Sequence, residues 1–453
     1  MPVVRTDDLG DALLALLTAA PGTAVEGLRR LSGGASRETW AFDLVGPDDR
    51  QELILQRLRP GATASSSGVG VEVEAALLRV AGAHGVPVAR VVASDDGSVL
   101  GSPGMVVERL PGETIARKLL RDDEWAPARD RLGAQVGAAC AAIHGIPVEA
   151  VPGLQPADQL AQYRAVLDGL GEPHPAFELG FRWLEANRPP DNPPCVVHGD
   201  LRLGNLLVDH DGLAAVLDWE LAHVGDPMED LGWFCVRAWR FGSPLPAGGV
   251  ATREDLVAAY EAAAGRTVDP EVLRWWEVLG TLKWGVICVM QAWGHLSGAS
   301  RSVELATIGR RVCENEWDVL GLLPGGPLSR HAAPSPVPGA ALHDRPSLAE
   351  LVDAVREWVD QDVRPGTEGR LSFHARVATN ALRMVERELA LEPDLTRAHV
   401  ERLLQLGCAD DRELAARIRS GALDGQAQEV RALVAASVHD KLLVANPGWL
   451  DDD

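Results

Sequence analysis

Three side chains that carry oxygen ligands lie close together in the sequence between residues 196 and 220. Asp200 ends an H-G-D tripeptide, Asn205 follows five residues later, and Asp218 follows after thirteen more. A carboxylate can accept the proton of a hydroxyl group, and carboxylate and amide oxygens are ligands that suit Mg²⁺. Phosphoryl transfer from a metal-bound nucleotide requires these parts, namely a base beside the acceptor hydroxyl and oxygen ligands for the metal.

The segment between Asn205 and Asp218 predicts a β-hairpin that would bring these two residues together. Apolar runs at 206–208 and 213–217 flank the turn D-H-D-G at 209–212. We therefore predict that Asp200 is a catalytic base and that Asn205 and Asp218 hold a metal ion. A chance H-G-D loop beside an ordinary strand end is the competing interpretation.

The composition argues against several classes of partner. The chain of 453 residues has a formal net charge of −22, which disfavours nucleic acid and anionic membranes because both are bound through clustered Lys and Arg. The six cysteines form no C-x-x-C pair, so we expect neither a disulfide framework nor a zinc site. No apolar run approaches the ~20 residues of a membrane span, and the acidic N-terminus does not resemble a signal peptide. We expect a cytoplasmic protein.

The periodicity of apolar residues divides the chain into four segments. It predicts a lobe of short strands with one helix in residues 1–110, and a mostly helical lobe in residues 111–325. Residues 326–344 are rich in Pro and Ala, which is typical of a linker, and residues 345–453 are helical again. The C-terminal helical domain is a candidate surface for a homodimer or a protein partner.

The motif H-G-D-x-x-x-x-N, followed by an aspartate at a hairpin end, resembles the aminoglycoside phosphotransferase-like branch of the protein-kinase-like fold. The resemblance spans residues 10–325 and is strongest to the kinase portion of certain acyl-CoA dehydrogenase fusions. The C-terminal segment resembles a helical domain of unknown function. The resemblance implies an α+β, bilobal fold with a small β-rich N-lobe and a larger helical C-lobe, followed by an all-α domain.

The resemblance also implies where a nucleotide would bind. Residues in the turn after the first strand would cover the phosphates, since glycine lets a backbone approach an anion closely. The backbone of the strand that joins the two lobes would bond the adenine edge. The residues implied are Gly33, Gly34 and Ser36 in the turn, and Glu108 and Leu110 in the connecting strand.

The sequence departs from the family pattern at the cation that would bind the phosphates. Kinases of this fold use a strand lysine paired with a helix glutamate, but the first lysine of this chain is Lys118. In the corresponding strand, Gln56 aligns best with the position of the family's lysine. Arg57 is the next residue, so its side chain would lie on the opposite face of the strand unless a β-bulge changed its direction. We favour Arg57, because only a cation offsets phosphate charge, and we expect Glu74 rather than Glu72 as its partner.

Several residues around Asp200 take roles by the same resemblance. Arg202 would contact the transferring phosphate as a forked donor, although an exposed loop arginine is the alternative. We expect His198 to brace the loop and Asp230 to support it by capping or hydrogen bonding. Glu220 is a further candidate for the metal shell.

The function implied is that of an ATP- and Mg²⁺-dependent small-molecule kinase, with ATP or another nucleoside triphosphate as donor. The acceptor would be the hydroxyl of a metabolite alcohol or of a hydroxyacyl thioester. An aminoglycoside-type antibiotic kinase is the first alternative. A non-catalytic, nucleotide-binding pseudokinase or scaffold is the second, and the missing strand lysine is its best support.

Overall fold

The computed structural model describes residues 8–18, 20–31, 37–59, 68–190, 192–332 and 346–451. They divide into two compact units, each built from two separate segments of the chain. The first unit combines Met1–Ala157 with Pro190–Glu277, and the second combines Asp158–Pro189 with Val278–Asp453. The first unit therefore contains every residue that the sequence assigns to the candidate site.

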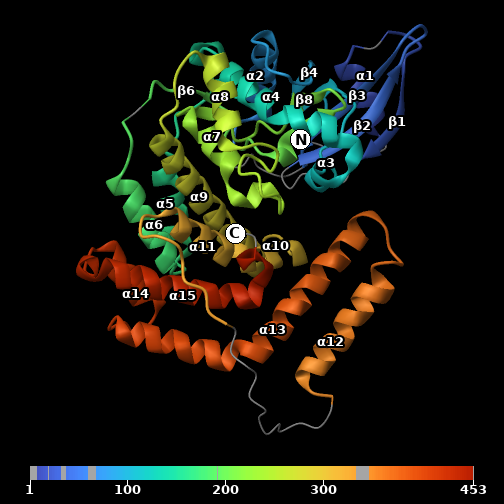
Figure 1. Cartoon of the computed structure of the whole chain (residues 1–453). Helices are drawn as coiled ribbons and strands as arrows, with labels where there is room; N and C mark the ends of the chain where they lie inside the picture. The colour runs from blue at the N-terminus through green and yellow to red at the C-terminus, as the bar shows by residue number, and fades with distance from the viewer. Residues whose placement is uncertain are drawn as a thin grey trace. The chain divides into compact units, whose positions relative to one another are not determined.

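A five-stranded antiparallel sheet forms the N-terminal part of the first unit, in the order β1-β2-β3-β5-β4 (Figure 1). The helices that accompany it are α1 and α2. The bounds are α1 Leu9–Leu16, β1 Ala24–Arg30, β2 Arg37–Val45, β3 Arg50–Leu58, α2 Val71–Ala83, β4 Val91–Asp96 and β5 Pro103–Glu108.

The two faces of this sheet bury different cores, because successive residues of a strand point to opposite sides. On one face, Leu53 and Leu55 of β3 share a core with Leu9 and Leu13 of α1. On the other face, residues such as Met105 of β5 join the core that includes α2 and the helices beyond it. The side of β3 on which a residue lies thus decides whether it faces α1 or α2.

The rest of the first unit is mostly helical and carries two small two-stranded sheets, β6-β9 and β7-β8. Helices α4 and α8 pack together through residues such as Leu132, Val136 and Leu256. The bounds are α3 Ala116–Arg121, α4 Ala126–His144, β6 Cys195–Val197, β7 Leu206–Asp209, β8 Gly212–Val216, β9 His223–Gly225, α7 Met228–Cys235, α8 Arg253–Ala264 and α9 Pro270–Leu296, whose later part belongs to the second unit. Short 3-10 turns lie at Asp123–Trp125, Val148–Ala150, Leu203–Asn205 and Arg237–Arg240.

The second unit is helical in its described residues, and its C-terminal helices share a core with helices that precede residue 325. Trp317 and Leu320 of α11 pack in one cluster with Leu403 of α13 and Val434 of α15. Helices α12 and α13 lie side by side (Figure 1). The bounds are α5 Gln159–Leu170, α6 Pro175–Ala186, α10 Val303–Ile308, α11 Val312–Leu322, α12 Leu348–Trp358, α13 Gly369–Gln405, α14 Asp411–Arg419 and α15 Ala427–Ala445, with short turns at Gly309–Arg311, Val359–Val363, Asp424–Gln426 and Pro447–Leu450.

Ion pairs with buried carboxylates accompany this shared core. Lys441 of α15 lies 3.1 Å from Glu316 of α11, and Arg419 of α14 lies 2.7 Å from Glu178 of α6. None of the helices in the described ranges combines the length and apolar character needed to cross a membrane.

Candidate active site

The predicted hairpin forms between Asn205 and Asp218. Strands β7 and β8 pair antiparallel, and beyond their last pair the Leu217 N–H donates to the Asn205 carbonyl at 2.8 Å. Asp218 follows immediately, with a φ of 62°. A non-glycine residue in this left-handed region is strained, and such strain is typical of functional sites.

The Asp200 carboxylate is held by three side chains. Trp233 Nε1 donates to Oδ1 at 2.9 Å, and Asn205 Nδ2 donates to Oδ2 at 2.7 Å. Arg202 Nε lies 3.3 Å from both oxygens, and its guanidinium carbon lies 5.1 Å from the ring centroid of Trp239. These donors fix the orientation of the Asp200 carboxylate.

Asn205 links Asp200 to the hairpin. Its Nδ2 also donates to the Asp200 carbonyl at 2.8 Å. Because the amide nitrogen is turned to Asp200, the Oδ1 atom is left as the group that can serve as a ligand for a cation.

The loop that carries Asp200 is braced by the buried Asp230. Its carboxylate accepts hydrogen bonds from the backbone N–H groups of His198 and Gly199, at 2.8 and 2.9 Å, and contacts His144 Nε2 at 3.1 Å. Burial alone would raise the pKa of Asp230, but the bond from His144 and the other partners lower it to about 2. The predicted supporting role of Asp230 is confirmed by these bonds.

His198 braces the same loop from within. Its Nε2 contacts the Leu217 carbonyl at 2.9 Å, and its Nδ1 accepts the Asp200 N–H at 3.2 Å. Burial lowers the pKa of His198, so the neutral ring is favoured, with the proton on Nε2. His198 therefore joins the loop to the end of the hairpin, as the sequence predicted.

Asp218 lies among other acids. Desolvation is the largest cause that raises the pKa of Asp218. The nearby carboxylates of Glu220, Asp200 and Glu74 raise this pKa further, to about 7. A divalent cation would offset this repulsion. The oxygen donors of Asp218 and Asn205 are of the type that Mg²⁺ prefers, so the residues present fit such an ion.

The prediction that Arg57 forms an ion pair with Glu74 is wrong. Glu74 Oε2 instead lies 2.5 Å from Nη1 of Arg37, the first residue of β2. Arg57 lies 3.1 Å from Glu38 and donates to the Leu100 carbonyl at 3.1 Å. Both ladders of β3 run without a bulge, so Arg57 stays on the face opposite α2.

The position of Gln56 follows from the same register. Gln56 pairs with Thr39 and Met105, and Arg37 lies two residues before Thr39 on the same face. Arg37 is 8% exposed, and its Nε lies 3.7 Å from Glu220 Oε2. The alternative partner Glu72 is exposed on α2.

The structure describes only some of the other residues that were predicted to bind the nucleotide. Gly33, Gly34 and Ser36 lie outside the described residues. The Glu108 N–H donates to the Arg90 carbonyl at 3.0 Å, and Leu110 follows the end of β5.

The segment after Leu110 is tied to the hairpin. Glu113 and Val208 exchange two backbone hydrogen bonds of 2.8 and 3.0 Å. At Gly112, with a φ of 150°, a Cβ would lie 2.8 Å from the Val208 carbonyl oxygen. Only glycine allows this close approach between the connecting segment and the β7–β8 hairpin.

Sequence reasoning missed Arg37 and Trp233. Trp233 follows Asp200 by thirty-three residues, on α7, and no local spacing signals this contact. Arg37 directly follows the glycine turn in the sequence. Its position in a strand, on the same face as Gln56, was the signal that could have identified it.

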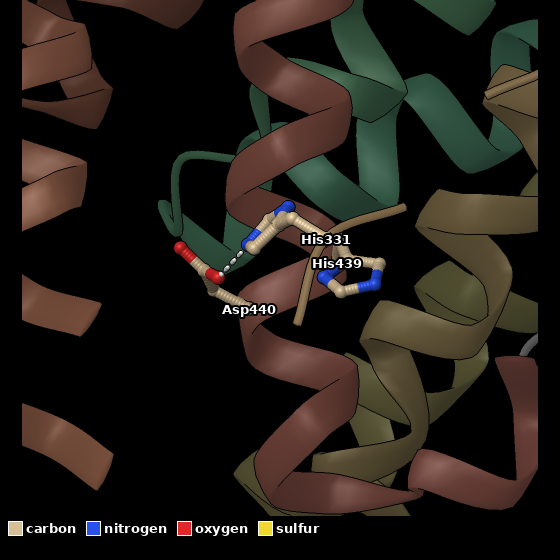
Figure 2. Close-up of side chains that lie close together, drawn as sticks. All are labelled: His331, His439 and Asp440. Atoms are coloured by element: carbon tan, nitrogen blue, oxygen red, sulfur yellow. Dashed lines mark hydrogen bonds and ion pairs between the residues drawn. The ribbon is translucent and has the colours of Figure 1, made fainter. Parts of the chain in front are cut away.

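A second group of potential metal ligands lies in the other unit (Figure 2). His331 Nε2 contacts Asp440 Oδ1 at 2.6 Å, and Arg402 lies 2.7 Å from Asp440 Oδ2. The rings of His331 and His439 lie with centroids 4.1 Å apart and are tilted by 40°. Because Arg402 already offsets the charge of Asp440, we assign no metal to this group.

Comparison with known families gives two matches along the chain. Residues 27–276 match the model of the phosphotransferase enzyme family. Residues 365–449 match the model of a domain of unknown function.

Two curated proteins show partial similarity. Acyl-CoA dehydrogenase family member 10 of Mus musculus is 29% identical over 259 residues, which are 52% of this chain and 23% of the mouse protein. A probable acyl-CoA dehydrogenase of Arabidopsis thaliana is 26% identical over 226 residues, 45% of this chain and 27% of that protein. The chain therefore spans about a quarter of the length of these relatives. The predicted resemblance to the kinase portion of such fusions is confirmed.

Two solved structures share the fold. One is a protein of Ralstonia eutropha described provisionally as an aminoglycoside phosphotransferase, with a TM-score of 0.54, 23% identity, and coverage of 68% of this chain and 97% of that one. The other is a spectinomycin phosphotransferase in complex with ADP and spectinomycin, with a TM-score of 0.51, 13% identity, and coverage of 69% and 99%. The predicted bilobal fold, with its antiparallel sheet and helical lobe, is confirmed.

Proposed function

Because this chain belongs to the phosphotransferase enzyme family, we propose that it is an ATP- and Mg²⁺-dependent small-molecule kinase. It moves the γ-phosphoryl group to a hydroxyl of its substrate. The observation that carries the proposal is the Asp200 carboxylate, held by Trp233 and Asn205 in a loop that Asp230 braces.

Asp200 is the catalytic base in this proposal. Its carboxylate orients the acceptor hydroxyl and takes the proton as the phosphoryl group is transferred. Arg202, beside Asp200, donates to the transferring phosphate and stabilises the charge that develops there.

The metal and the nucleotide have separate sets of residues. Asn205 and Asp218 hold Mg²⁺, which supplies charge neutralisation and orientation of the phosphates. The Glu108 carbonyl and the Leu110 N–H bond the adenine edge. Gly33, Gly34 and Ser36 are proposed to contact the phosphates.

Two observations bear on this nucleotide site. The spectinomycin phosphotransferase that shares the fold was solved with ADP, which supports an adenine nucleotide as donor. Arg57 is left out of the site, because it contacts Glu38 and the Leu100 carbonyl on the far face of the sheet.

For the acceptor we propose a metabolite alcohol, with a hydroxyacyl thioester as the first compound class to test. The similarity to proteins named as acyl-CoA dehydrogenases supports this choice. The aminoglycoside-type acceptor remains the alternative, since the solved structures that share the fold bear names of antibiotic phosphotransferases.

The test is ADP release by the full chain with MgATP and a panel of hydroxyacyl thioesters, other hydroxylated metabolites and aminoglycosides. We expect ADP release stimulated by one class, and a fall of about 10³-fold or more in Asp200→Ala, since the variant loses both the base and its orienting contacts. Nucleotide binding without transfer to any acceptor would instead favour a binding module. Unchanged turnover in Asp200→Ala would refute the assignment of the base.

A further inference from the structure

Strand β3 has Gln56 rather than a cation at the position where the nucleotide phosphates would need one. In kinases of this fold a lysine in the third strand binds the phosphates and pairs with a helix glutamate. Here β3 presents Gln56 on the face toward α2, while Arg57 points to the opposite face. The three lysines of the chain are Lys118, Lys283 and Lys441, and none is in the sheet.

Arg37 supplies a positive charge on the correct face. It begins β2, and its register places it on the same side of the sheet as Gln56. Its guanidinium lies 2.5 Å from Glu74 of α2 and 3.7 Å from Glu220, two residues after Asp218. The pair of strand cation and helix glutamate is therefore present, but the cation comes from a different strand.

The chemistry of arginine suits this position. A guanidinium has five N–H donors in a rigid plane, so bonding one carboxylate leaves donors for phosphate oxygens. Arg37 also directly follows the residues Gly33 to Ser36 in the sequence, which the proposed function assigns to the phosphate-covering turn. Glu74 is buried and fixes the arginine in place.

We propose that Arg37, positioned by Glu74, binds the nucleotide phosphates in this chain and replaces the lysine that β3 lacks. The inference rests on the proposed function, because it assumes that the first unit binds ATP. It assigns a phosphate-binding role to a residue of β2 and removes the missing strand lysine as an argument for a non-catalytic protein.

The test compares the affinity of MgATP and of adenosine for the full chain by isothermal titration calorimetry. In Arg37→Gln we expect MgATP to bind about 10- to 100-fold more weakly, which is the usual loss for a charge-assisted hydrogen bond. Adenosine has no phosphates, so its affinity should change by less than about twofold. In Arg57→Gln, the other buried strand arginine, MgATP affinity should stay within about twofold of wild type.

A double variant separates phosphate binding from a purely structural pairing of Arg37 with Glu74. In Arg37→Gln/Glu74→Gln the buried charge is removed together with its partner, so stability should recover while MgATP affinity stays low. Recovery of MgATP affinity in this variant would overturn the proposal, as would a larger loss in Arg57→Gln than in Arg37→Gln.

A rescue experiment tests whether a cation placed on β3 restores MgATP affinity. Arg37→Gln/Gln56→Lys returns a cation to β3 on the same face, and it should regain part of the lost MgATP affinity. Adenosine binding without MgATP binding by the wild-type chain would refute the proposed function itself. Wild-type binding of MgATP with no effect of Arg37→Gln would refute only the role of Arg37.

Discussion

At the scale of single residues, the account depends on how the Asp200 carboxylate is oriented. A base must point one lone pair at the acceptor hydroxyl, and Trp233 and Asn205 each occupy one oxygen of Asp200, at 2.9 and 2.7 Å. Arg202 restricts the same group from a third direction. These contacts hold the Asp200 carboxylate in a fixed orientation, which is what its proposed role as a base requires.

Trp233→Phe tests this orientation, because it removes the N–H donor while it keeps most of the ring. We expect kcat with the acceptor to fall about tenfold, which corresponds to the loss of one hydrogen bond to a charged group. The KM for ATP should change by less than about twofold, since Trp233 donates to Asp200, the proposed base.

Trp239→Phe is the matched control, since Trp239 packs against Trp233 at 5.1 Å between ring centroids but leaves the bond to Asp200 in place. Its kcat should stay close to wild type. An equal fall in both variants would mean that packing, rather than the hydrogen bond to Asp200, explains the effect.

The residues whose proximity could be predicted from the sequence are those whose geometry is local. Asp200, Asn205 and Asp218 lie within one loop and hairpin, so spacing alone brought them together. The pairing of Glu74 could not be predicted in this way. It depends on strand register and on the position of α2, which together select Arg37 over Arg57.

At the scale of elements, the H-G-D loop requires a glycine for two reasons. Gly199 has a φ of 78°, and a Cβ there would lie 2.4 Å from the Leu221 carbonyl oxygen. The backbone of the loop therefore passes too close to the segment after the hairpin for any side chain. This close approach brings the Asp200 loop against the elements that carry Asp218.

Gly199→Ala should destabilise the protein by about 2 kcal/mol or more, because the backbone must shift as well as bear a positive φ. Gly265→Ala is the control, since Gly265 has a φ of 66° with no atom within 4 Å of the added Cβ. It should cost about 1 kcal/mol. The measurement is urea denaturation of both variants, and equal losses would contradict the role of the close contact.

The long helix α13 shows where local signals fail at this scale. A proline usually ends or kinks a helix, but Gly369–Gln405 is one helix with Pro393 inside it. Proline removes one backbone donor and disfavours the helical conformation of the preceding residue. Here the amphipathic pattern on both sides and the packing against α12 and α15 outweigh that local cost.

At the scale of the whole molecule, the C-terminal helices share a core with helices that precede residue 325. The sequence predicts a separate helical domain at 345–453, and this division stays a prediction. Glu316 is buried at the contact between α11 and α15. Burial opposes its ionisation, but Lys441 and His174 lower its pKa to about 2.

Lys441→Met should reduce the free energy of unfolding by about 1–3 kcal/mol, because it leaves the Glu316 charge with His174 alone. We place the loss below that of a fully buried pair, since the Lys441 side chain is 43% exposed. Arg397→Met breaks an exposed pair with Asp394 and should cost less than about 0.5 kcal/mol. Equal stability of the two variants would show that the Lys441 contact contributes little.

We propose that the first unit binds a nucleotide through a metal ion held by Asn205 and Asp218. The most direct measurement is the affinity of ATP, with and without Mg²⁺, for wild type and Asp218→Ala. We predict that Mg²⁺ tightens ATP binding about tenfold or more in wild type and has little effect in the variant. Full retention of the Mg²⁺ effect in Asp218→Ala, or its absence in wild type, would contradict the account.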